Sequence, residues 1–104
     1  TLPPATGTGR ILKFFVGTTF SGNGIVQVTT TDIIQGALAV TTDAAGVVIP
    51  TAATSDTITM SGTTTGGVKG SLIVLQDIAS GLWGVSGGLV STGAEATPFS
   101  AAVS

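Results

Sequence analysis

Apolar and polar positions alternate with a period of two in several short stretches of the chain. In residues 56–61, Ile58 and Met60 fall on one face, and the intervening Thr and Ser residues fall on the other. Residues 25–31 alternate in the same way. Because successive side chains of a strand point to opposite faces, this pattern predicts half-exposed β-strands, with a Thr-rich outward face for residues 56–61.

Two other stretches are apolar on both faces. They are residues 11–16 (ILKFFV) and 72–75 (LIVL). Strands of this kind are covered on both sides. In a domain this small, we expect another subunit to provide the second cover. Phe14 and Phe15 point to opposite faces of one strand, so one fills the core and the other needs a separate cover.

Turn residues divide the chain into eight candidate strands about ten residues apart, and no segment keeps an apolar period of 3.6 between Gly or Pro breaks. The candidates are residues 10–16, 24–30, 33–40, 47–49, 57–61, 71–77, 82–85 and 99–103. This spacing predicts an all-β fold, a small antiparallel β-sandwich or barrel of about 7–8 short strands. We expect one domain over residues 1–104, with an extended N-terminal arm at 1–9 and a C-terminal segment at 94–104.

The composition changes the picture of the surface. Only 8% of the 104 residues are charged, the net charge is −2, and the chain has no Cys, His or Tyr. It therefore has no basic field for nucleic acid or an anionic membrane. The longest hydrophobic stretch, residues 72–90, is interrupted by polar residues and glycines and does not predict a membrane span. Much of the surface must consist of Thr, Ser, Gly, Ala and larger apolar groups, which favours association with a partner.

The chain offers little catalytic chemistry. Residues 62–71 (GTTTGGVKGS) lack the contiguous Gly-Lys-Ser/Thr of a phosphate-binding loop, so we interpret them as a flexible hairpin loop. Asp32, Asp43, Asp56 and Asp77 stand singly at expected turns, where Asp caps nearby backbone N–H groups. We find no acid/base pair and no metal-ligand cluster. The sequence therefore indicates a protein that is not an enzyme and needs no cofactor.

The large apolar side chains are the candidate contact residues. Trp83 is the one Trp, and its apolar neighbours favour a place in the core or in a subunit interface. The four Phe residues carry the same two alternatives. The candidate interface residues are Leu2, Phe14, Phe15, Trp83 and Phe99.

Several phrases of the chain resemble the capsid decoration (cement) proteins of tailed bacteriophages. They are residues 2–9 (LPPATGTG), 15–19 (FVGTT), 55–59 (SDTIT) with 62–67 (GTTTGG), and 93–100 (GAEATPFS). The resemblance implies a β-rich, non-enzymatic structural protein on the outer surface of the virion. It would bind the major capsid protein and stabilise contacts between capsomers, as a homotrimer or alternatively as a dimer.

A second hypothesis is a receptor- or glycan-binding tip domain of a phage fibre or spike. Such a domain needs an exposed aromatic side chain with polar groups converging on it. Trp83 is the candidate for that aromatic side chain.

Overall fold

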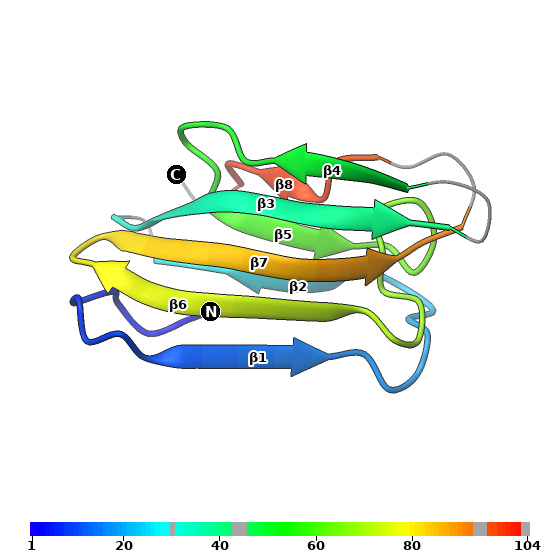
Figure 1. Cartoon of the computed structure of the whole chain (residues 1–104), viewed down its shortest axis with the longest axis horizontal. Coiled ribbons are helices and arrows are strands. Elements are labelled where there is room, and N and C mark those ends of the chain that lie inside the picture. The colour runs from blue at the N-terminus through cyan, green and yellow to red at the C-terminus, as the bar shows by residue number, and fades with distance from the viewer. Residues whose placement is uncertain (30, 43–45, 93–95, 103–104) are drawn as a thin grey trace.

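The computed structural model describes residues 1–29, 31–42, 46–92 and 96–102, and these form eight strands in two sheets (Figure 1). The bounds are β1 Ile11–Phe15, β2 Gly24–Gln27, β3 Ile33–Thr41, β4 Gly46–Pro50, β5 Thr57–Met60, β6 Leu72–Ala79, β7 Leu82–Val90 and β8 Phe99–Ser100. The predicted all-β fold is confirmed. Each predicted strand has a counterpart, and β7 continues five residues beyond the predicted end.

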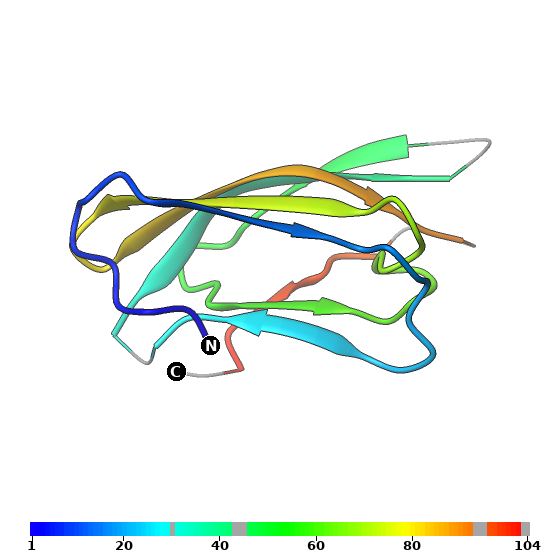
Figure 2. The same ribbon diagram turned by 90° about the horizontal axis from the view of Figure 1, so that it is seen from below.

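The two sheets stack as a sandwich (Figure 2). The larger sheet has the order β1-β6-β7-β3-β4, and the smaller has the order β2-β5-β8. The sheets do not join into a closed barrel, so the chain adopts the sandwich, one of the two predicted architectures. The edges β1 and β2 lie on one side of this sandwich, which we call the open side.

One strand pair departs from the predicted antiparallel arrangement. β3 and β7 are parallel, with Ile34 opposite Trp83 and Val40 opposite Leu89, whereas the other pairs in the described residues are antiparallel. The chain forms the hairpin β3–β4, crosses to β5 in the smaller sheet and returns with the hairpin β6–β7. This crossover brings β7 back beside β3 in the same direction.

The core lies between the facing surfaces of the two sheets. Its largest fully buried side chains are Trp83, Ile34, Leu38, Ile58, Ile73, Leu75 and Leu89. The predicted outward Thr face of residues 56–61 is wrong at Thr57, which is buried. β5 is the middle strand of its sheet, and the Thr57 hydroxyl there donates a hydrogen bond to Asp56 Oδ1 at 2.9 Å.

Residues 1–9 form an arm across one end of the sandwich. The Leu2 N–H donates to the Gln27 carbonyl at 2.8 Å, and the Ala5 N–H donates to Asp32 Oδ2 at 2.8 Å. Farther along, the Thr6 and Gly7 N–H groups both donate to the Asp77 carboxylate. The arm therefore connects the edge of the smaller sheet with the larger sheet.

Candidate binding surfaces

The structure separates the five candidate interface residues into two groups. Leu2, Trp83 and Phe99 are buried in the domain's own core. Phe14 is half-buried and packs against that core, whereas Phe15 points to the opposite face and is 67% exposed. Because a buried side chain offers no surface to a partner, Phe15 and the exposed part of Phe14 are the members of this set that a partner can contact.

The outward side of the five-stranded sheet is uncovered and largely apolar, with Gln35, Thr41, Gln76 and Ser86 as its uncharged polar positions. Alternation along the strands places Phe15, Val48 and Ile78 on this side, and these side chains are 67%, 66% and 51% exposed. Lys13 is the one charged side chain that the described strand residues direct to it. No described part of the chain lies over it (Figures 1 and 2). We call this surface the outer apolar face.

The centre of the outer apolar face carries small residues. The outward positions of β7 include Gly84, Ser86 and Gly88, and the adjacent outward positions of β3 include Ala37 and Ala39. Short side chains keep the middle of the face low and leave the larger apolar groups toward its margins.

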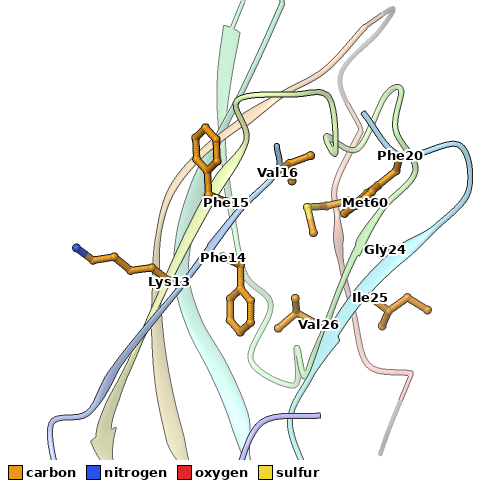
Figure 3. Close-up of a pocket in the computed structure, with 9 residues that line it drawn as sticks. All are labelled: Lys13, Phe14, Phe15, Val16, Phe20, Gly24, Ile25, Val26 and Met60. Atoms are coloured by element: carbon orange, nitrogen blue, oxygen red, sulfur yellow. The ribbon is translucent and has the colours of Figure 1, made fainter. Parts of the chain in front are cut away.

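A second apolar surface is a groove on the open side, between the edges β1 and β2 (Figure 3). It has a volume of about 460 Å³, within the range of roughly 300–1,000 Å³ typical of ligand sites. Its lining residues are Lys13, Phe14, Phe15, Val16, Phe20, Gly24, Ile25, Val26 and Met60. Figure 3 shows Phe14 and Val26 directed into the space between the two strands.

The glycine-rich segment has a packing role that the sequence did not reveal. A Cβ atom on Gly67 would lie 2.7 Å from the Phe20 ring, and a Cβ on Gly24 would lie 2.2 Å from it. The Phe20 N–H also donates to the Gly67 carbonyl at 3.0 Å. The glycines leave room for Phe20, which forms one wall of the groove. The contact between Phe20 and Gly67 joins residues 47 positions apart, so no local pattern could have predicted it.

The predicted turn-capping role is wrong for Asp77. This residue lies within β6, and its carboxylate accepts hydrogen bonds from the Thr6 and Gly7 N–H groups and from the Thr8 hydroxyl. The bond from the Thr6 N–H is the main cause that holds the pKa of Asp77 below its ordinary value of 3.8, and burial acts in the opposite direction. Asp77 therefore holds the N-terminal arm.

Asp32 has a similar long-range role. Its carboxylate accepts from the Ala5 N–H, 27 residues away in the sequence. Asp43, another predicted turn position, lies outside the described residues. Within the described ranges, no group of three or more Asp, Glu, His or Cys side chains is placed to hold a metal ion. No helix in the described part of the chain is long and apolar enough to cross a membrane.

Comparison of the chain with protein-family models, with curated proteins and with solved structures finds no significant match in any of the three.

Proposed function

We propose that this protein is a non-enzymatic structural protein of a tailed-phage virion. In this proposal it binds the outer surface of the capsid, contacts the major capsid protein and stabilises contacts between neighbouring capsomers. It associates with itself as a homotrimer, or alternatively as a dimer.

The observation that carries the proposal is the outer apolar face. Strands of five to nine residues, five abreast, span roughly 500–700 Å². A stable protein interface buries about 800 Å² on each partner, so the face has nearly the area that a specific contact needs. Repetition of a modest contact over many copies on a shell would add further stabilisation through multivalency.

The low charge of the face supports the same proposal. With Lys13 as its one described charge, the face loses little ion hydration when a partner covers it. The largest apolar patch on a typical monomer covers about 300–600 Å² and is often functional, and larger exposed patches mark interaction sites. In the alternative, a receptor- or glycan-binding tip domain, Trp83 was the candidate aromatic side chain, and its full burial removes it from that role.

Cosedimentation with empty heads of the source phage tests this proposal. We expect the unmodified protein to sediment with the heads and V48E to remain mostly in the supernatant, because the added carboxylate would be desolvated in the contact. V47E is the matched control, because Val47 is the neighbour on β4, is 45% exposed and points to the opposite side. Failure of the unmodified protein to bind heads, or equal loss in both variants, would refute the proposal.

A further inference from the structure

Strand β1 presents an unpaired backbone edge along the open side. Two hydrogen bonds show which residues of β1 direct their backbone N–H and C=O groups toward β6. The Val16 N–H donates to the Ser71 carbonyl, and the Asp77 N–H donates to the Arg10 carbonyl, both at 2.8 Å. Because bonding alternates along an antiparallel pair, the even-numbered residues of β1 bond to β6. The N–H and C=O groups of the odd-numbered residues Ile11, Lys13 and Phe15 therefore point away from the sheet.

The other strand edges are blocked or shorter. At β4, the bond from the Thr51 N–H to the Gly36 carbonyl places Pro50 at a free-edge position, where it has no N–H to donate. At β2, the outward carbonyl of Gln27 already accepts from Leu2 of the arm. β8 has only two residues. Among the described edges, β1 therefore offers the longest row of free backbone groups.

The groove on the open side lies directly beside this free edge. A strand added next to β1 would direct every second side chain into the space between β1 and β2. Phe14, Val26 and Met60 line that space and would contact those side chains. Backbone edge and apolar groove together are the two parts of a site for β-strand addition, in which main-chain bonds provide affinity and side-chain pockets provide selectivity.

The charges around β1 specify the partner. All three cationic side chains of the chain lie along this strand: Arg10 precedes it, Lys13 lies within it and Lys69 lies next to its end, since the adjacent Gly70 N–H donates to the Val16 carbonyl. In the described residues none of the three forms an ion pair.

The acidic side chains Asp32, Asp56 and Asp77, by contrast, are buried. The edge is therefore cationic although the whole chain has a net charge of −2.

The same charges oppose pairing of β1 with a second copy of itself. An antiparallel pair of two β1 strands centred on Lys13 would place the two ammonium groups opposite each other, which is destabilising. We propose that β1 and the groove bind an extended segment of another polypeptide, with apolar residues at alternate positions and carboxylates on its outward side. This inference does not depend on the partner being a capsid protein.

Two blocked nonapeptides, DVTVDVTVD and KVTVKVTVK, test the proposal against the full chain. In the first, the central Asp pairs with Lys13 and the four Val side chains enter the groove. We expect it to bind at least about tenfold more tightly than the second at low salt, with the difference shrinking as salt rises. K13E should weaken binding of the acidic peptide at least about threefold, and because Lys13 is exposed this variant should fold normally.

Amide hydrogen exchange distinguishes strand addition at β1 from nonspecific binding of the peptide. Binding should slow exchange at Ile11, Lys13 and Phe15, whereas Leu12 and Phe14 are already bonded to β6 and should change little. The proposal is overturned if neither peptide binds at about 1 mM or if both bind equally. It is overturned as well if amide exchange does not slow at alternate residues of β1. It is also overturned if the three amides become protected on raising the concentration of the protein alone, which would show self-pairing.

Discussion

The glycines around Phe20 show how a single residue type can decide packing. Gly67 has a φ of +89° and carries no side chain at a point where a Cβ would overlap the Phe20 ring. Gly9 has a similar φ of +78°, but no atom lies within 4 Å of its Cβ position. Alanine substitutions at the two positions therefore separate two effects on the free energy of unfolding: the strain of a left-handed backbone, present at both, and the overlap with Phe20, present only at Gly67.

We expect G67A to be more destabilising than G9A. A left-handed conformation costs a residue with a Cβ about 1–2 kcal/mol, and this is the whole effect expected for G9A. Overpacking against Phe20 adds about 1–3 kcal/mol for G67A. Urea denaturation followed by the fluorescence of Trp83, the one Trp, measures both. Equal free energies of unfolding for the two variants would show that Phe20 moves aside freely.

The neighbouring residues Phe14 and Phe15 illustrate what the sequence predicted at this scale. Strand alternation correctly placed them on opposite faces, because that depends only on local geometry. The pattern could not identify which one faces the core, because the answer depends on where the smaller sheet lies. Trp83 was equally ambiguous, and its full burial in the folded domain, on the same face as Ile34, shows that it belongs to the core.

At the scale of elements, the N-terminal arm depends on one carboxylate. Asp77 accepts bonds from Thr6 and Gly7, 71 and 70 residues away in the sequence. Because its pKa is lowered in the folded protein, the stabilisation is complete at pH values above about 3.8 and is lost as the pH falls through the folded pKa. Acid should therefore loosen the arm before it affects strands that lack a carboxylate contact.

We expect the Thr6 and Gly7 amide signals to titrate together in an NMR pH series, with an apparent pKa below 3.8. The D77N variant should remove this titration and lower the unfolding temperature at neutral pH, because an amide offers one acceptor oxygen in place of two. A titration midpoint at or above 3.8, or an unchanged arm in D77N, would contradict the role assigned to Asp77.

The strands themselves were largely predictable, because their alternation and turn residues are local signals. The β6–β7 turn is an example: it falls between the predicted strands 71–77 and 82–85, and Gly81 there has a φ of +79°. The free edge of β1 was not predictable from its sequence alone. It depends on which neighbour β1 has, and on the arm lying at β2 instead of covering β1.

At the scale of the whole molecule, an outer apolar face and few charges favour self-association. We expect light scattering to give a mass above that of the monomer, three times the monomer mass for the proposed homotrimer. F15E should lower that mass because it places a carboxylate on the outer apolar face. I25E is the control, since Ile25 is 56% exposed but belongs to the other sheet. A fully monomeric, highly soluble protein would contradict this expectation.

The sequence by itself determined the all-β class, the approximate position of each strand and the shortage of surface charge. These properties follow from side-chain alternation, turn chemistry and composition, which act over a few residues or over the chain as a sum. Tertiary structure alone decided that β7 lies parallel to β3, that Trp83 belongs to the core and that Asp77 holds the arm. It also gathered the three cations along one free edge. Each of these depends on which distant segments become neighbours, and that choice is made by burial of the whole core.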